Sequence, residues 1–447
     1  MTELKQYRIS ARSAAGLVAE LEAGLAAGRL LPGQRLPSVR RLAAEAGISP
    51  ATVAAGLAEL RRRGVVLTEP RRGTRIGDGP PIGSPRAPMP VPPGARDLSR
   101  GNPDPALLPD LGRALGRALG SAELPVRLYG EAPELGELIE IARAQLDGDG
   151  VPDGGLCILS GAMDAIERVL QANLRQGDRV AVEDPGYADL FDLLRAQGLN
   201  LEAVPIDRRG MLPGPLEAAL ARGVSAVILT PRGQNPTGAA IDAGRAAELR
   251  ETLARHPGVL VVEDDHLGPI AGHPLHSLLA GRTSWAATRS VAKALGPDLR
   301  LAVLAADGRT LARVRGRQQR GPGWVSHLLQ RLVVELWRDS EVQLLVERAA
   351  ATYSERRQGL IDALAGHGIK AEGQSGLNVW VGVPEEVGVM GALLQRGWVV
   401  APGSHYRLVS SAPAIRITTA TLEPAEGERL AGELAGVLAP ARASRTG

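Results

Sequence analysis

The sequence predicts a multidomain protein with a small α+β domain at its N-terminus and a large α/β domain behind it. Its 447 residues are enough for two to four domains. The first 76 residues carry 13 basic and 6 acidic side chains, a net charge of +7, whereas residues 77–447 have a net charge of −4. Between these parts, residues 77–97 are rich in proline and glycine, which is typical of an extended linker.

The N-terminal part has the pattern of three helices and a β-hairpin. Leucine and valine recur there at helical spacing, and Ser38 and Ser49 are each placed to cap a following helix. The expected elements are helices over residues 14–27, 39–46 and from 50 onward, and strands over 65–67 and 74–76. This order predicts a helix-turn-helix followed by a wing over residues 1–76.

Short apolar runs alternate with helical patterns through most of the large part, residues 98–447. The runs lie at residues 180–183, 226–230, 259–263, 286–288 and 301–305, and clear helical patterns at 162–174 and 242–255. Such alternation predicts a mainly parallel sheet covered on both faces. From about residue 342, long helical stretches precede strands near 377–381 and 415–418, which predicts a smaller C-terminal α+β subdomain.

Composition also limits where the protein works. No apolar run approaches the ~20 residues that span a bilayer, and the first residues show no secretory pattern. A single cysteine, Cys157, leaves no intrachain disulfide and no cysteine-rich metal site. We therefore expect a cytoplasmic protein that is associated with the nucleoid when it binds DNA, with no metal centre and no membrane partner.

Residues 31–66 resemble the winged helix-turn-helix of the GntR family of bacterial regulators. The shared marks are Leu36-Pro37-Ser38, Gly47-Ile48-Ser49, Thr52-Val53 and a wing glycine. The resemblance implies binding of double-stranded promoter DNA through Arg40, Ser49, Thr52, Arg72 and Gly73. The helix expected in the major groove carries Ala51, Ala54 and Ala55, whose side chains make no bidentate base contacts. The alternative for this part is a solvated basic face on an ordinary small helical domain.

Several loops that follow strands carry residues suited to an anionic, aromatic ligand. Ser160-Gly161-Ala162 precedes a helix and offers backbone N–H groups to a phosphate. Tyr187 follows a second strand and Asn235 a third. The run Glu263-Asp264-Asp265-His266 ends a fourth strand, where carboxylates are candidate site residues; the alternative for this run is a solvent-exposed turn.

Lys293 is one of only three lysines, with Lys5 and Lys370, in a chain whose other basic residues are all arginine. The excess of arginine is explained by codon bias in a GC-rich genome, so the three lysines are candidates for a role that arginine cannot fill. Only a primary amine forms a Schiff base, and the neighbours of Lys293 favour it among the three. Ser290 and Arg300 flank it with groups that suit a phosphate. Arg416, between apolar residues near the chain end, calls for an anion, either a ligand or an internal salt-bridge partner.

These pieces, in this order, resemble the fold-type I pyridoxal-phosphate (PLP) aminotransferases. The resemblance implies that Lys293 holds PLP as a Schiff base, that Asp264 faces the pyridine nitrogen, that Asn235 reaches the 3′-oxygen and that Tyr187 stacks on the ring. It further implies that Arg416 binds a ligand carboxylate, with Asn378 nearby. The residues implied for the phosphate are Gly161, Ala162, Ser290, Arg300 and, from a neighbouring subunit, Tyr129.

The sequence departs from that family at two positions close to the cofactor. His266 stands where a tyrosine usually reaches the 3′-oxygen, so the charge there is expected to depend on pH. Ala292 stands where a second serine is usual, which removes one hydroxyl from the phosphate.

The whole order of parts resembles the MocR subfamily of bacterial transcription regulators. This resemblance implies a homodimeric, PLP-dependent regulator that senses PLP or an amino compound through its aminotransferase-like domain. The main alternative is an active aminotransferase that carries a DNA-binding appendage, with sensing and residual turnover both compatible with the same residues. A third alternative, an inert scaffold, is disfavoured by the residues around Lys293.

Overall fold

The computed structural model describes residues 11–26, 29–31, 33–62, 65–69, 73–77, 91–120, 128–409 and 411–439. The chain forms two compact units that divide between Ala87 and Pro88, with the short stretches Arg175–Arg179 and Asp189–Leu201 grouped with the N-terminal unit. Most of the predicted linker lies outside the described residues.

The N-terminal unit contains the predicted helix-turn-helix and wing, which confirms this part of the fold class. Its elements are α1 (Ala14–Ala26), α2 (Val39–Ala46), α3 (Pro50–Arg62) and the antiparallel strands β1 (Val66–Glu69) and β2 (Gly73–Ile76). Ser38 caps α2 by accepting from the backbone of Arg41, and Gly47 ends it in the left-handed conformation. A Cβ on Gly56 would lie 2.9 Å from Leu17, so this glycine allows α1 and α3 to pack closely.

An eight-stranded mixed sheet forms the centre of the large unit. Its spatial order is β4-β11-β10-β9-β8-β5-β6-β7. The strands are β4 (Gly155–Leu159), β5 (Arg179–Asp184), β6 (Asn200–Asp207), β7 (Gly210–Met211), β8 (Ala226–Leu229), β9 (Leu260–Asp265), β10 (Trp285–Ser290) and β11 (Ala302–Ala306). The β5–β8, β8–β9 and β9–β10 pairs are parallel, whereas β11 is antiparallel to both β10 and β4.

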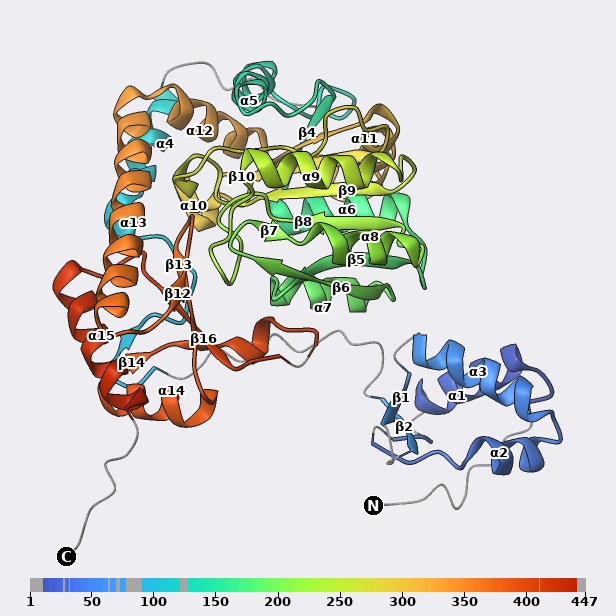
Figure 1. Ribbon diagram of the computed structural model, residues 1–447. Helices are drawn as coiled ribbons and strands as arrows, with labels where there is room; N and C mark the ends of the chain where they lie inside the picture. The colour runs from blue at the N-terminus through green and yellow to red at the C-terminus, as the bar shows by residue number, and fades with distance from the viewer. Residues whose placement is uncertain are drawn as a thin grey trace, which may run out of the picture. The chain divides into compact units, whose positions relative to one another are not determined.

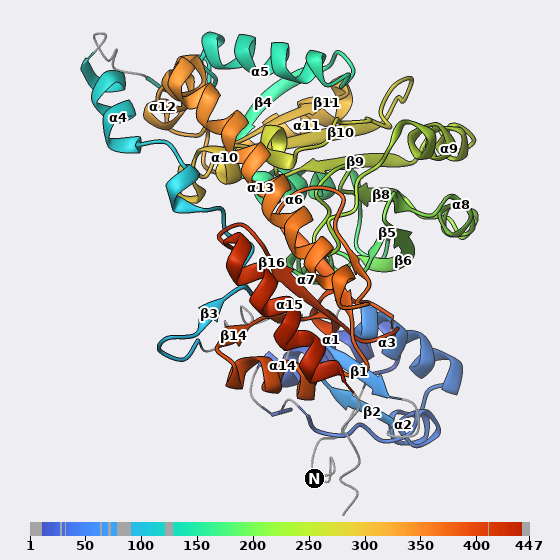
Figure 2. The same cartoon turned by 60° about the vertical axis from the view of Figure 1, so that its left-hand side comes forward.

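Helices cover both faces of this sheet, as the alternating pattern predicts. α6 and α11 pack on the part of the sheet that contains β4 and β11. α8 and α9 pack on each other, on the opposite side of the strands from α6 (Figure 2). The helices of this part are α4 (Leu111–Gly120), α5 (Gly136–Gly148), α6 (Ala162–Asn173), α7 (Ala188–Ala196), α8 (Pro213–Ala221), α9 (Ala243–Ala254), α10 (Ala292–Leu295), α11 (Gly308–Gln319) and α12 (His327–Arg338).

The smaller subdomain begins with the long helix α13 (Ser340–Gly366), which runs beside α15 (Pro424–Leu438) in both views (Figures 1 and 2). Its main sheet has the order β12-β13-β16-β15. The remaining elements of this subdomain are β12 (Ala371–Glu372), β13 (Asn378–Gly382), α14 (Glu386–Gln395), β14 (Trp398–Val399), β15 (Ala401–Pro402) and β16 (Ala414–Thr418). Short 3-10 helices occur along the whole large unit, at Pro105–Leu107, Gly268–Ala271, Pro297–Leu299 and Gly403–Tyr406.

The structure corrects one predicted boundary. Residues 96–97 were assigned to the linker, but they form β3 (Arg96–Asp97), which pairs in parallel with β14 of the smaller subdomain. Leu98 is fully buried in the core of the same subdomain. A pairing between segments about 300 residues apart leaves no local pattern, so the sequence did not indicate it.

Among the helices that the structure describes, none is long and apolar enough to cross a membrane.

Candidate functional site

Most of the predicted cofactor residues lie at one edge of the large sheet. β4 is antiparallel to β11 and therefore runs in the same direction as β10, β9, β8 and β5. The carboxyl ends of all five strands thus lie along one edge, where open α/β sheets bind ligands. Loops that leave this edge carry the residues that the sequence singled out.

Groups suited to binding an anion lie together where β4 leads into α6. Gly161 is the N-cap of α6, with φ 107° and ψ 165°, and leaves the first backbone N–H groups of the helix without a side-chain cap. Arg300, just before β11, donates to the carbonyl of Ser160 over 3.4 Å. A Cβ on Gly161 would lie 2.6 Å from Nη2 of Arg300, so only glycine allows the guanidinium to approach. Ser290 ends the neighbouring strand β10. These groups fit a phosphate.

Asp264 presents a buried carboxylate without a cation. It is 8% exposed, and its Oδ1 finds no hydrogen-bond partner among the described residues. Burial, and then the neighbouring Asp265, raise the pKa of Asp264 to about 7. A protonated pyridine nitrogen would supply both the missing donor and the missing positive charge. This orphaned oxygen is the feature that fits the predicted cofactor.

Lys293, Asn235 and Arg416 are brought together by the segment that follows β3. Nζ of Lys293 donates to the carbonyl of Gly101, and Nη2 of Arg416 donates to the carbonyl of Ser99. Nη1 of Arg416 also donates to Oδ1 of Asn235 over 2.9 Å. These three side chains, which the sequence assigned to one site, come from α10, from the loop after β8 and from β16.

The alternative for Arg416 is an internal salt bridge, and no such ion pair is found for it among the described residues. Burial lowers the pKa of Arg416 more than the charge of Asp97 raises it, but no carboxylate among the described residues forms an ion pair with the guanidinium, and Nε has no hydrogen-bond partner there. The guanidinium lies 4.9 Å above the ring of Tyr406. A buried cation held by an aromatic face and neutral oxygens is suited to an added carboxylate.

Two bases near the site have depressed pKa values. Burial, and then the positive charge of Arg416, lower the pKa of Lys293 to about 8. Burial, and then Lys293, lower the pKa of half-buried His266 to about 4. The His266 imidazole is therefore neutral at pH 7, and the charge change expected from its sequence position falls below the physiological range.

The remaining predicted residues occupy different surroundings. Asn378 is buried on β13 and its Oδ1 accepts from the hydroxyl of Thr418 over 3.0 Å. Tyr187 is half-buried and close enough to Arg416 to interact with it electrostatically. Tyr129 lies apart from these contacts: it is 94% exposed and meets Trp324 edge-on at 5.6 Å. Its predicted role in a neighbouring subunit's site stays a prediction.

The N-terminal unit presents the predicted DNA-contacting residues on its surface. Arg40 on α2 is exposed, and Oγ of Ser49 accepts from the backbone of Thr52 at the start of α3. The exposed positions of α3 include Ala51, Ala54, Ala55 and Ala58. Gly73 has φ 84° at the start of β2, whereas Arg72 lies outside the described residues. The small apolar side chains on α3 offer no hydrogen-bond donors or acceptors for base edges.

Sequence reasoning missed three groups around the site. The first is Tyr406 beneath Arg416, which no motif marked. The second is the pair of carbonyls at Ser99 and Gly101, because backbone acceptors carry no residue signature. The third is a pair of buried arginines, Arg232 and Arg289, that bind Asp265. They could not be distinguished in a chain with so many arginines.

Two family profiles match the chain. The profile described as aminotransferase class I and II matches residues 137–434, and the profile described as bacterial regulatory proteins of the gntR family matches residues 14–76. The first match contains the side chains of the cofactor site just described except Tyr129, whereas Ser99 and Gly101 precede it.

The chain is also similar to named transcriptional regulators and to solved aminotransferase structures. The chain is 41% identical over 416 residues to the vitamin B6 salvage pathway transcriptional repressor PtsJ of Salmonella typhimurium, covering 91% of this chain and 94% of that protein. It is 30% identical over 269 residues to the pyridoxine biosynthesis transcriptional regulator PdxR of Corynebacterium glutamicum, covering 57% of each. Among solved structures, α-aminoadipate aminotransferase LysN of Thermus thermophilus, with a phosphopyridoxyl-leucine ligand, matches with a TM-score of 0.68 at 24% identity, covering 77% and 92% of the two chains.

Proposed function

The chain belongs to the MocR-type regulators, which join a GntR-family DNA-binding segment to a class I and II aminotransferase domain, and on this premise we propose that it controls transcription in response to PLP or an amino compound. The observation that carries the proposal is the presence, in one chain, of an intact cofactor-lysine site and an exposed helix-turn-helix. Pyridoxal phosphate is the cofactor of the aminotransferase domain. It supplies an aldehyde that captures amines and an electron-poor ring.

Each part of the site has a proposed task toward that cofactor. Gly161, Ala162, Ser290 and Arg300 hold the phosphate, and Asp264 holds the ring nitrogen in its protonated form. Asn235 and neutral His266 donate to the 3′-oxygen, and Tyr187 covers the ring. The support is the shared sheet edge, the glycine-dependent approach of Arg300 and the orphaned oxygen of Asp264.

The amine of Lys293 is prepared for covalent attachment. With its pKa lowered to about 8, more of the amine is unprotonated near neutral pH than at the ordinary lysine pKa, although the protonated form still predominates there; only the unprotonated amine attacks a carbonyl. Arg416, which lowers this pKa, also offers the carboxylate-binding guanidinium. A ligand that carries both an amino group and a carboxylate would therefore contact both ends of the site.

The signal itself is proposed to be PLP or a closely related vitamin B6 compound. PtsJ and PdxR are named for control of vitamin B6 salvage and pyridoxine biosynthesis. A regulator of that metabolism needs to measure the cofactor, and a site that binds PLP through Lys293 measures it directly. An amino acid bound at Arg416 is the other effector that the site supports.

We further propose that the regulator acts as a homodimer on paired half-sites. The large unit exposes several large apolar side chains on α4, α12, α13 and the loop before α5. Single exposed apolar residues need no explanation, but several of them favour an interface with another protein. They are Leu115, Leu119, Leu128, Tyr129, Leu328 and Leu344. A dimer would also supply specificity that the alanine-rich α3 lacks, because half-site spacing adds a geometric constraint.

A working aminotransferase with a DNA-binding appendage is the second candidate. The residues that favour it are Lys293, Asp264 and Arg416, since transamination requires a covalent lysine, a ring-nitrogen partner and a carboxylate anchor. Multiple-turnover transfer from an amino donor to a 2-oxo acid would favour this candidate, and specific protection of a promoter region without turnover would favour the regulator.

The first experiment traps the cofactor. Purified protein with added PLP is reduced with borohydride and digested, and the labelled peptide is identified by mass spectrometry. We expect the label on Lys293, with none in Lys293→Ala and wild-type labelling in the control variant Lys370→Ala. Footprinting of the same preparation on its own promoter region should show protection. Label on another lysine, or no visible absorbance band, would refute the proposal.

A further inference from the structure

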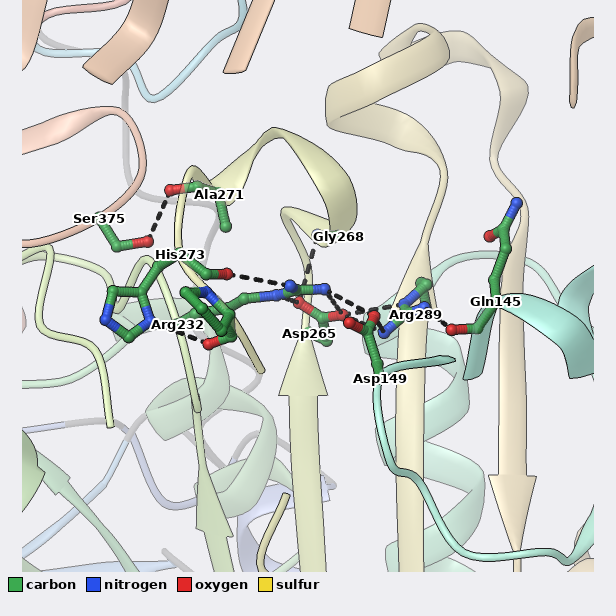
Figure 3. A network of polar contacts seen from close by, with 10 residues as sticks. Gln145, Asp149, Arg232, Asp265, Gly268, Ala271, His273, Arg289 and Ser375 are labelled. Atoms are coloured by element: carbon green, nitrogen blue, oxygen red, sulfur yellow. Dashed lines mark hydrogen bonds and ion pairs between the residues drawn. The ribbon is translucent and has the colours of Figure 1, made fainter. Parts of the chain in front are cut away.

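Four charged side chains, three of them buried and Asp149 partly exposed, form a network next to the cofactor residues. Arg232 forms a bidentate ion pair with Asp265, in which the Nε–Oδ1 and Nη2–Oδ2 distances are both 2.9 Å. Arg289 approaches the same carboxylate at 2.8 and 2.9 Å, and both arginines also bind Asp149, at 3.1 and 2.5 Å. Figure 3 shows Asp265 between the two guanidinium groups, with Asp149 beside them.

The two arginines are also fixed to the backbone around them. Nη1 of Arg232 donates to the carbonyl of His273 over 3.1 Å, and Nη1 of Arg289 donates to the carbonyl of Gln145 over 3.4 Å (Figure 3). The side chains of Asp265, Arg232 and Arg289 are 5–6% exposed. The network is neutral overall, with two cations and two anions, and its good geometry compensates the cost of burial.

Because side chains alternate along a strand, Asp265 and Arg289 lie on the face of the large sheet opposite to Asp264. Asp265 pairs in register with Arg289, and Asp264 pairs with Thr288. Side chains in register on parallel strands share a face, and successive residues alternate between faces. Asp265 and Arg289 therefore lie on one face of the sheet, whereas Asp264 and Thr288 lie on the other.

The network and the site are interleaved along the chain. Asp265 lies between Asp264 and His266, Arg289 is followed by Ser290, and Arg232 stands three residues before Asn235. The network thus joins the ends of β9 and β10 and the loop after β8. Every one of these segments contributes a residue to the proposed cofactor site.

We propose that Asp265 is a positioning residue that, through Arg232 and Arg289, fixes the three segments from which the cofactor-binding side chains extend. Because the inference concerns how PLP is held, it rests on the proposed function. Asp265 makes no contact with the cofactor in this account. It sets the direction in which Asp264 points and the spacing between Asp264, Asn235 and Ser290.

Charge supports the same assignment. Burial alone would raise the pKa of Asp265, but Arg289 and Arg232 outweigh it and hold the pKa at about 2. Asp265 is therefore a permanent anion one residue from Asp264. Without it, the two arginines would face only Asp149, and their excess positive charge would disfavour a protonated ring nitrogen at Asp264.

The test compares three variants of the full-length protein with the wild type. Asp265→Asn removes the shared carboxylate, and Arg289→Lys keeps the charge but loses the two-point contact. Asp207→Asn is the matched control, because Asp207 binds another buried arginine, Arg245, at 2.8 Å near the other end of the sheet. The measurements are the PLP dissociation constant from visible absorbance, the circular dichroism of the bound cofactor, and thermal unfolding without PLP.

Asp265→Asn and Arg289→Lys are expected to bind PLP at least about tenfold more weakly, which corresponds to ~1.4 kcal/mol, and to change the visible dichroism band. Asp207→Asn should be destabilised but keep the wild-type affinity and band. Wild-type affinity and dichroism in both network variants would overturn the inference, even if both melt at lower temperature. If Asp265→Asn does not fold, Arg289→Lys decides by the same criteria. A wild type without any PLP band would instead refute the proposed function.

Discussion

Replacing Gly161 by alanine tests the proposed phosphate site most sharply, because this residue acts on the site in two separable ways. Its backbone, at φ 107° and ψ 165°, lies in a region that is essentially restricted to glycine, so alanine costs about 1–3 kcal/mol of the free energy of unfolding. Its added Cβ would also lie 2.6 Å from Nη2 of Arg300 and would displace the guanidinium. Loss of one charge-assisted hydrogen bond to the phosphate costs about 1.5–3 kcal/mol, or about 10- to 150-fold in PLP affinity.

The assay separates these two effects. Thermal unfolding without PLP reports the backbone cost, and a visible-absorbance titration reports the affinity. Gly281→Ala is the control, since Gly281 also has positive φ, at 74°, but its Cβ would meet no described atom within 4 Å. The control should lose stability and keep its PLP affinity.

A double-mutant cycle assigns the affinity loss to Arg300. If alanine at residue 161 acts by displacing this guanidinium, Gly161→Ala combined with Arg300→Ala should bind PLP about as weakly as Arg300→Ala alone. Gly161→Ala that binds PLP as tightly as Gly281→Ala would refute the placement of the phosphate between α6 and Arg300.

Three further predictions concern the other parts of the protein. The pKa of Lys293 is lowered to about 8, so the protonated amine predominates below that pH. The rate of PLP attachment, measured by stopped-flow absorbance, should therefore rise with pH and level off above about 8. A rate that continues to rise toward about pH 10 would contradict this prediction. Arg416→Ala and Arg416→Lys should keep PLP attached but lose the spectral change caused by an amino acid, because neither side chain makes the two-point contact with a carboxylate. A wild-type spectral response in these variants would indicate that Arg416 has a structural role only. Arg40→Ala should weaken binding to promoter and unrelated DNA by similar factors, as measured by fluorescence anisotropy. It should also lower the slope of log binding constant against log salt concentration by about one unit. An effect confined to the promoter would indicate that Arg40 contacts bases directly.

The site was predictable to the extent that it follows from strand order. Lys293, Asp264 and Asn235 each follow an apolar run, and parallel strands bring such positions to one edge whatever the details of packing. The helix-turn-helix was predictable for a similar reason, because Ser38, Gly47 and Ser49 are local signals that act within a few residues of the chain.

What the sequence could not indicate depends on contacts between distant segments. Asp265 belongs to the same acidic run as Asp264, but its two arginine partners are 33 and 24 residues away and look like any other arginine. The lowered pKa of His266 depends on burial and on Lys293, neither of which is visible from its position in the chain. Likewise, β3 joins the smaller subdomain through a partner at the far end of the sequence.

The central claim is that PLP, held by Lys293, changes the affinity of this protein for DNA. The direct measurement is the binding of full-length wild type and Lys293→Ala to the protein's own promoter region, with and without PLP, at fixed salt. We predict that PLP changes the wild-type dissociation constant by about fivefold or more, the usual lower range of allosteric coupling, and that Lys293→Ala binds the DNA without responding to PLP. Equal responses in the two proteins, or a wild type that binds PLP with no change in DNA affinity, would contradict the account.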